Sequence, residues 1–435
     1  MDHLELSGRF DRPNVLIDPK KKNADLSLLI TISPGESLRQ IESDVRAGTN
    51  VCLLIDVSQS MEEEGKLSAA IAAGRELVEL TGHQDTLLSI VAFDDEPYIL
   101  ASGLSAKDKA TLLESLEGLK SVGGGMTNIT SGLDAAINEV VQQPDESRAR
   151  VIILLSDGED NTCKPDVIHS ALRAAENDIQ LFAVGIGDSY EADFLKALVA
   201  PSNGTLFGHE DVQKVKEAFI DLAITLASVV ATQVVLTLDF HPKALVGKTY
   251  KASPDQLFLG NARPGPDRRL SRRVGNVERN KAYAFLYTLS TPTDQESPLP
   301  LVHATLSYDV PALNIRQAQV ETTFGVHLSK DRALTERQDG AVLECYRRVQ
   351  ITELVERFVD AHHAGRAQDT SRYLDLLIKK YNDVNDQKMV NHYQKIRSSL
   401  VAGGLISRPM INASVVASTV VRGGGELPQL VSDDF

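Results

Sequence analysis

Residues 51–61, VCLLIDVSQSM, decide the fold of this chain. The run is apolar up to Asp56, and serines follow at positions 58 and 60. A short, continuous apolar run is typical of a strand that is buried on both faces of a sheet. Alternate side chains of an extended segment point the same way, so Asp56, Ser58 and Ser60 are predicted to direct one carboxylate and two hydroxyls to a common point.

Between residues 48 and 228 the chain alternates apolar runs with amphipathic segments. The further runs that we expect to be buried strands are 87–93, 150–157 and 179–187. The segments that predict helices are 66–80, 129–141 and 211–227. Strands that alternate with helices predict a mainly parallel sheet with helices on both faces. The functional site of such a sheet is expected at the carboxyl ends of its strands.

The two flanks of this α/β unit have a different pattern. Residues 1–47 and 229–330 alternate apolar and polar positions and show little helical periodicity. The simplest arrangement is one β-sandwich built from both flanks, with the unit at 48–228 inserted between them, because domain termini often lie close together. Two separate β pieces are the alternative.

The last part of the chain changes period again. Apolar positions at helical spacing in 331–404 predict a bundle or hairpin of helices, which Gly403 and Gly404 end. Residues 405–435 have no clear helical period, so we expect a tail that is flexible or folds on a partner. The predicted fold class is therefore α/β and Rossmann-like for 48–228, with a β-sandwich and a helical segment added.

Two other predicted strand-end turns carry side chains that match those of the first. GGGMTNIT precedes a helix and exposes Thr127 in a glycine-rich backbone, and LLSDGED ends a strand and exposes Asp157. Carboxylate and hydroxyl oxygens are hard ligands, which suit Mg²⁺, Mn²⁺ or Ca²⁺ better than Zn²⁺. The three turns together predict a divalent-cation site.

On these residues, the segment 48–228 resembles the von Willebrand factor type A family. The metal-ion-dependent adhesion site of that family is a DxSxS motif, then a distant Thr, then a distant Asp. The residues that fill the five positions here are Asp56, Ser58, Ser60, Thr127 and Asp157. The threonine loop departs from the usual GGTN because Met126 stands between the glycines and Thr127.

The resemblance implies an open Rossmann-like domain that binds Mg²⁺ at its top, with Mn²⁺ or Ca²⁺ as alternative ions. In the family, the serines and the threonine commonly contact the metal, and the aspartates often act through water. Such a site keeps a coordination position for a Glu or Asp of a protein partner. The alternative is that Asp56 and Asp157 are only helix caps and turn residues.

Composition argues against several classes of partner. The chain has 435 residues, with 45 Lys plus Arg against 60 Asp plus Glu, so its net charge is −15. This charge argues against non-specific binding to nucleic acid and to anionic membranes. We expect a cytoplasmic protein, because the amino terminus has no signal-peptide pattern and no apolar run reaches about 18 residues.

Three other features each have two interpretations. Asp94 and Asp95 form either a rim around the metal or, as we prefer, a solvated hairpin turn. The arginine-rich segment 263–273 either binds an acidic or phosphorylated partner or, as we prefer, is a solvated loop of the β domain. Ser418 and Thr419 are either accessible to a kinase or, as we prefer, unmodified.

The sequence therefore predicts a non-enzymatic adaptor or scaffold, with no catalytic residues and no organic cofactor. Bacterial proteins that resemble this architecture often act alongside Ser/Thr kinases, so the resemblance implies a kinase, a phosphatase or a phosphothreonine-reading protein as a partner. One alternative is a substrate-recruiting subunit of an AAA+ ATPase or chelatase-type machine. A metal-dependent hydrolase is disfavoured because no histidine accompanies the three loops. A surface adhesin is disfavoured by the missing signal-peptide pattern.

Overall fold

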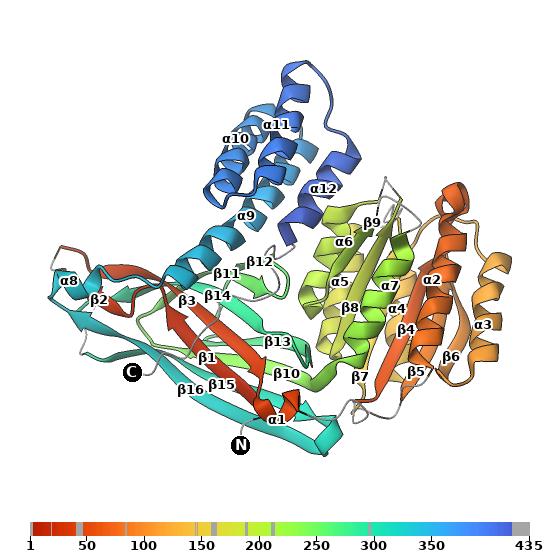
Figure 1. Cartoon of the computed structure of the whole chain (residues 1–435), viewed down its shortest axis with the longest axis horizontal. Helices are drawn as coiled ribbons and strands as arrows, with labels where there is room; N and C mark the ends of the chain where they lie inside the picture. The colour runs from red at the N-terminus through yellow and green to blue at the C-terminus, as the bar shows by residue number, and fades with distance from the viewer. Residues whose placement is uncertain are drawn as a thin grey trace.

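The computed structural model describes residues 3–18, 20–40, 47–82, 85–143, 145, 147–157, 163–187, 190–209, 214–294 and 297–419. Figure 1 shows an α/β domain at one end of the molecule and a β-sandwich at the other, with the carboxyl-terminal helices above the junction between them. The predicted fold class, an α/β unit combined with a β-sandwich and a helical segment, is confirmed.

The α/β domain is built on a six-stranded sheet with the order β6-β5-β4-β7-β8-β9. The edge strand β6 is antiparallel to β5, and the other neighbours are parallel. The strands are β4 (Thr49–Asp56), β5 (Thr86–Phe93), β6 (Pro97–Ser105), β7 (Ala149–Ser156), β8 (Ile179–Ile186) and β9 (Leu206–His209). The central strand β4 is buried along its whole length because helices cover both faces of the sheet.

Helices pack on the two faces of this sheet in separate cores. On one face lie α2 (Lys66–Thr81), α3 (Lys109–Gly118) and α7 (Val215–Ala227), against alternate residues of β4 such as Leu53. On the other face lie α4 (Ile129–Val141), α5 (Lys164–Glu176) and α6 (Ala192–Val199), against the intervening residues such as Leu54. The 3-10 helices of this domain are Gln59–Gly65, Leu119–Ser121 and Ala200–Ser202.

The β-sandwich combines the two flanks of the chain, as the sequence pattern predicts. One sheet has the order β1-β3-β14-β11-β12 and the other the order β13-β10-β15-β16-β2. The amino-terminal elements are β1 (Leu4–Phe10), β2 (Asn14–Leu16), β3 (Asn23–Pro34) and α1 (Glu36–Arg39). The later elements are β10 (Val229–Phe240), β11 (Leu245–Ser253), β12 (Leu257–Asn261), β13 (Arg269–Glu278), β14 (Tyr283–Pro292), β15 (Leu299–Val310), the 3-10 turn Pro311–Leu313 and β16 (Ile315–Ser329).

The α/β domain is an insertion in this sandwich. Strand β3 comes before the domain and β14 comes after it, yet the two pair along their length, from Asn23 with Pro292 to Ile32 with Tyr283. Where the chain enters and leaves the domain, Ala47 and Val229 belong to one small apolar cluster. The two connections therefore lie side by side.

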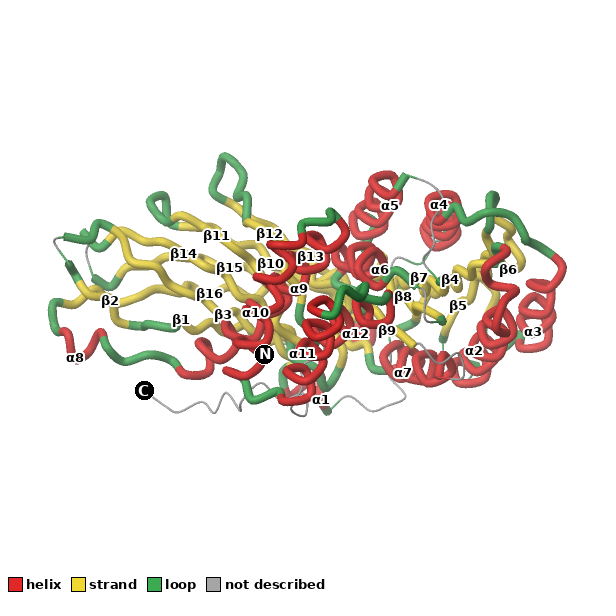
Figure 2. The backbone as a smooth tube through the Cα atoms, turned by 90° about the horizontal axis from the view of Figure 1, so that it is seen from above, coloured by secondary structure: helices red, strands yellow, loops and turns green. Residues whose placement is uncertain are grey.

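The carboxyl-terminal helices join both domains. They are α8 (Arg332–Thr335), α9 (Gly340–His363), α10 (Ala367–Asp383), α11 (Gln387–Val401) and α12 (Arg408–Thr419). The first half of α9 packs on the sandwich, where Val342 and Val349 share a core with Tyr250. Its second half, through Val355 and Phe358, shares a core with the α/β domain and the later helices. Figure 2 shows α9 to α12 between the two domains, whereas α8 lies at the far end of the sandwich.

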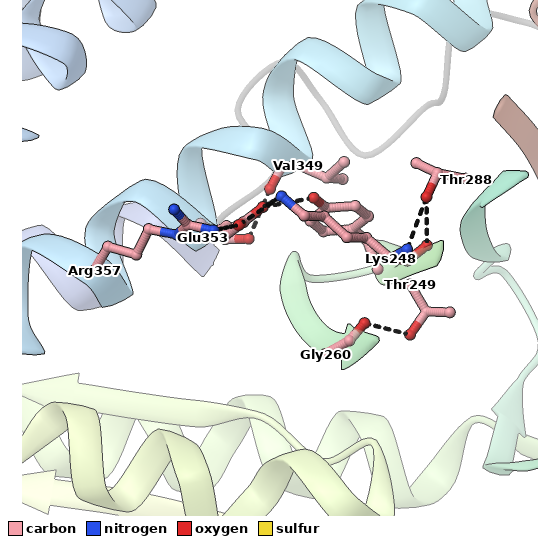
Figure 3. Close-up of polar contacts among 9 residues, drawn as sticks. Lys248, Thr249, Gly260, Thr288, Val349, Glu353 and Arg357 are labelled. Carbon is pink, nitrogen blue, oxygen red and sulfur yellow. Dashed lines mark hydrogen bonds and ion pairs between the residues drawn. The ribbon is translucent and has the colours of Figure 1, made fainter. Parts of the chain in front are cut away.

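A buried carboxylate fixes α9 to the sandwich, as Figure 3 shows. Glu353 accepts hydrogen bonds from Lys248 Nζ at 2.7 and 2.9 Å, from Tyr250 Oη at 2.7 Å and from Arg357 Nη2 at 2.5 Å. Burial raises the pKa of Glu353, but these donors outweigh burial and leave that pKa below its usual value. This carboxylate is stabilised as an anion by the chain itself.

Two expectations from the sequence differ from the structure. The tail from residue 405 is not irregular throughout, because α12 is a helix whose Ile411 and Val415 are buried. Its small residues give a weak helical pattern, and contacts with α6 and α9 order it. Ser418 and Thr419 are buried in that helix rather than accessible. Residues 420–435 lie outside the described part.

The arginine-rich segment is also not a solvated loop throughout. Arg269, Arg272 and Arg273 belong to strand β13. Arg269 forms an ion pair with Asp239 at 2.5 Å, and Arg273 forms one with Asp178 of the α/β domain. These arginines therefore contribute to the sheet and to the contact between domains.

Candidate metal centre

The carboxyl end of β4 places the DxSxS residues. Asp56 is the last residue of the strand, and a 3-10 helix begins at Gln59. The backbone N–H of Ser58 donates to Asp56 Oδ1 at 2.9 Å, which turns the chain back over the strand end. The hydroxyl oxygens of Ser58 and Ser60 then lie 3.2 Å apart. The serines are therefore brought together, as the alternation predicts.

Asp56 is a buried carboxylate whose hydrogen-bond donors are neutral. Its side chain is fully buried, and the Ser156 hydroxyl donates to its Oδ2 at 2.6 Å. Burial raises the pKa of Asp56 to about 6; hydrogen bonds from Ser156 and Ser58 lower it, and the charge of Asp157 raises it. A cation beside this carboxylate would oppose the effect of burial, so the site favours binding one.

The threonine loop is tied to the β4 loop by its backbone. Gly124 N–H donates to Val57 O at 2.9 Å, and Gln59 N–H donates to Gly125 O at 3.0 Å. Gly123 has a φ of +93°, and a Cβ there would lie 2.3 Å from Val57 O, so only glycine fits this approach. These bonds hold the buried Thr127 next to the serine loop.

Asp94 anchors the threonine loop from the β5–β6 hairpin. Its Oδ1 accepts the Glu96 N–H at 3.1 Å, as expected for a hairpin turn, and its Oδ2 accepts the Gly125 N–H at 3.0 Å. Asp94 O also accepts the Asn128 N–H at 2.9 Å. Asp94 is buried whereas Asp95 is exposed, so the hairpin both turns the chain and supports the metal edge.

Asp157 follows β7 and lies at the same edge, fully buried. Its Oδ2 is 3.2 Å from Nζ of Lys66, the first residue of α2. Lys66 is 4% exposed, so this ion pair is inside the protein. The sequence patterns did not single out Lys66, Ser156 or the loop-anchoring role of Asp94.

The donor set fits Mg²⁺. In an octahedral Mg²⁺ shell, neighbouring oxygens lie about 3 Å apart, and the Ser58 and Ser60 hydroxyl oxygens are 3.2 Å apart. Within the described residues, no group of three or more His, Cys, Asp and Glu side chains is arranged to hold a metal. A cation at this edge would therefore rely on hydroxyl ligands beside Asp56 and Asp157, as the motif predicts.

Comparison with known proteins identifies the family of this domain. A family model described as the von Willebrand factor type A domain matches residues 50–220. Residues 50–220 form a von Willebrand factor type A domain. Domains of this family commonly mediate metal-dependent protein–protein interaction, typically by binding a divalent metal at the adhesion site.

The likeness to solved structures extends beyond the von Willebrand domain. A structure titled von Willebrand factor type A from Catenulispora acidiphila covers 96% of this chain and 97% of its own, with a TM-score of 0.78 and 16% identity. The ArnB paralog VWA2 from Sulfolobus acidocaldarius covers 96% of this chain and 98% of its own, with a TM-score of 0.57 and 18% identity. Both therefore share the fold, including the sandwich and the helices.

A sequence relative covers most of the chain as well. An uncharacterized protein of Synechocystis sp. is 25% identical over 339 residues, which is 76% of this chain and 79% of the relative. The described residues contain no helix that is long and apolar enough to cross a membrane.

Proposed function

We propose that the chain is a non-enzymatic adaptor whose von Willebrand domain binds Mg²⁺ and, through it, an acidic side chain of a protein partner. Ser58, Ser60 and Thr127 would supply hydroxyl ligands, and Asp56 and Asp157 would supply charge. The observation that carries this proposal is the environment of Asp56, a fully buried carboxylate that accepts hydrogen bonds from two neutral donors, the Ser58 N–H and the Ser156 hydroxyl. Bound Mg²⁺ supplies a Lewis-acidic centre for a carboxylate oxygen.

The surface around the site restricts the partner. Three loops at this edge, residues 57–65, 94–96 and 122–128, contain acidic residues but no Lys or Arg. Glu62, Glu63, Asp95 and Glu96 are exposed. A partner that brings a carboxylate to this edge would therefore need basic residues around it to compensate the local repulsion. Met126, 63% exposed beside Thr127, offers an apolar contact to the same partner.

Purification with and without chelator tests the proposal. Wild type and Asp56→Ala would be used as baits in Mg²⁺ and in EDTA, with Asp375→Ala as a matched control in the helical segment. Asp375 pairs with Arg397 on the surface, so this change should leave metal binding intact. We expect one set of partners to be retained by wild type and Asp375→Ala in Mg²⁺, and lost in EDTA or with Asp56→Ala. Retention of the same set by Asp56→Ala in EDTA would contradict metal-dependent capture.

The other functions remain predictions from the sequence. An AAA+ or chelatase-type partner would be recognised by nucleotide-dependent release of the captured protein. A hydrolase would need a general base at the metal edge, and the loop sequences 57–65, 94–96 and 122–128 contain no histidine. A role in Ser/Thr kinase signalling and a cytoplasmic location are likewise predictions. The buried positions of Ser418 and Thr419 do not favour a phosphorylated tail as the link.

A further inference from the structure

Lys66 is a buried cation at the metal edge that the family motif does not include. It begins α2, and its ammonium nitrogen lies 3.2 Å from Asp157 Oδ2. The Lys66 side chain is 5% exposed and the Asp157 side chain 0% exposed. Coulombic interaction in such a site is screened far less than at the surface. The charge of Lys66 therefore raises the electrostatic potential at the position that a bound metal would occupy.

The surrounding backbone holds the lysine in this position. Gly65 precedes it with a φ of +74°, which redirects the chain from the 3-10 helix into α2. At the end of β8, a Cβ on Gly187 would lie 2.9 Å from Lys66 Cε. Gly187 has a φ of +88°, so glycine at this turn leaves room for the aliphatic part of the side chain. Loops from β4, β7 and β8 thus meet around one ammonium group.

The charges of the site follow from these contacts. Asp56 and Asp157 provide two negative charges, the Ser and Thr hydroxyls are neutral, and Lys66 provides one positive charge. A divalent cation bound there would give the motif residues and Lys66 together one net positive charge; the Asp94 carboxylate, which anchors the threonine loop, lies outside this set. Without Lys66, the two carboxylates would neutralise the same cation completely.

We propose that Lys66 sets the strength of the metal site: it weakens Mg²⁺ binding and preserves the positive charge that attracts the carboxylate of a partner. This inference rests on the proposed function, because it concerns the same cation. Lys66 is not a metal ligand in this scheme; it acts on the metal through its charge, from a position beside Asp157. The positive charge that Lys66 preserves also explains how an edge with exposed acidic side chains can attract an acidic side chain of a partner.

Titration of the full chain with MgCl₂ by isothermal calorimetry tests this role. The variants are Lys66→Met and Lys66→Gln, where Gln keeps an N–H donor for Asp157 without the charge. Lys196→Met is the matched control, because Lys196 is also buried and its Nζ lies 3.2 Å from Glu356, on a different face of the domain. We expect both Lys66 variants to bind Mg²⁺ about tenfold more tightly than wild type, since removing a nearby positive charge favours the cation. Lys196→Met should match wild type.

A second measurement separates binding from folding. The rise in melting temperature caused by Mg²⁺ should be larger for the Lys66 variants than for wild type, because a tighter ligand stabilises more at the same concentration. Mg²⁺ affinity of Lys66→Gln that is equal to or weaker than that of wild type would overturn the inference, and so would loss of folding in both variants at saturating Mg²⁺. If wild type and Asp56→Ala both fail to bind Mg²⁺, the proposed function itself is wrong.

Discussion

Asp56 in the von Willebrand domain and Glu353 on helix α9 are two buried carboxylates with opposite surroundings. Glu353 receives Lys248, Tyr250 and Arg357, and these donors lower its pKa despite burial. Asp56 receives a hydroxyl and a backbone amide, and burial raises its pKa to about 6. A carboxylate with its own cations fixes two parts of the fold together. A carboxylate with neutral donors costs stability until a cation arrives from solution.

Removing the Glu353 charge should have the largest effect on stability. Glu353→Gln leaves Lys248 and Arg357 without their anion, so we expect the free energy of unfolding to fall by about 2–3 kcal/mol. Mg²⁺ affinity should not change, because this contact lies outside the metal edge. Chemical denaturation and calorimetric titration measure the two quantities. Glu344→Gln is the control, since Glu344 pairs with Arg348 in a partly exposed contact that should contribute little. If the Glu353→Gln protein is as stable as wild type, the Glu353 carboxylate does not stabilise the contact between α9 and the sandwich, and its contrast with Asp56 fails.

In chelator, removing the Asp56 charge should raise the free energy of unfolding, which is the opposite of the effect expected at Glu353. With a folded pKa near 6, Asp56 holds its proton to a higher pH than in the unfolded chain, so the stability it contributes is lost as pH rises through 6. In EDTA at pH 7, Asp56→Asn should therefore raise the free energy of unfolding by about 2 kcal/mol, with a smaller gain at pH 4.

Glu353 provides the contrasting pH profile. Its pKa is lowered in the folded protein, so its contribution is present at neutral pH and is lost as pH falls through that lowered pKa. Unfolding curves of wild type, Asp56→Asn and Glu353→Gln between pH 3 and 7 compare the two carboxylates. Parallel profiles for the two variants would contradict their opposite environments.

The backbone of the threonine loop can be tested without changing any charge. Gly123→Ala places a Cβ against Val57 O and strains a backbone with a φ of +93°. We expect Mg²⁺ affinity to fall about tenfold, because the loop that holds Thr127 must move away from the serine loop. Gly118→Ala is the matched control, since a Cβ there meets nothing within 4 Å. Equal Mg²⁺ affinities for the two variants would show that the close contact between Gly123 and Val57 O does not hold the threonine loop in place.

The sequence predicts how the DxSxS residues lie at the end of β4, and the metal site that they suggest stays a prediction. The apolar run before Asp56 gives the strand, and the alternation of Ser58 with Ser60 gives the direction of their side chains. Lys66 has no such signal, because a lysine in the first turn of an amphipathic helix is usually solvated. Its burial depends on the distant turns at Asp157 and Gly187, which only the folded sheet brings together.

Helix α12 is a second feature that the sequence pattern does not predict. Its small side chains give little periodicity, so its order depends on contacts that are remote in sequence. Asn412 donates to Tyr190 O at 2.8 Å and accepts from the Ala192 N–H at 3.3 Å, which joins α12 to the start of α6.

Asn412→Ala is the smallest perturbation in this series. We expect a loss of about 1 kcal/mol in stability, and faster hydrogen exchange in α12, because two buried hydrogen bonds disappear. Exchange measured by mass spectrometry should localise the change to α12 and the start of α6. Unchanged exchange in α12 would show that its apolar contacts alone hold it.

The position of β4 has a mechanical consequence. The strand is joined to the sandwich at its Thr49 end, and the metal residues follow its Asp56 end, so a partner pulling on the metal would load the strand along its axis. Strand β4 lies between β5 and β7 and is paired with both over nearly its whole length. Tension would therefore shear two ladders at once, and their hydrogen bonds would share the force rather than open one after another. If a partner binds there as proposed, its pull would pass along β4 to the sandwich, and the two ladders would resist displacement of the strand together.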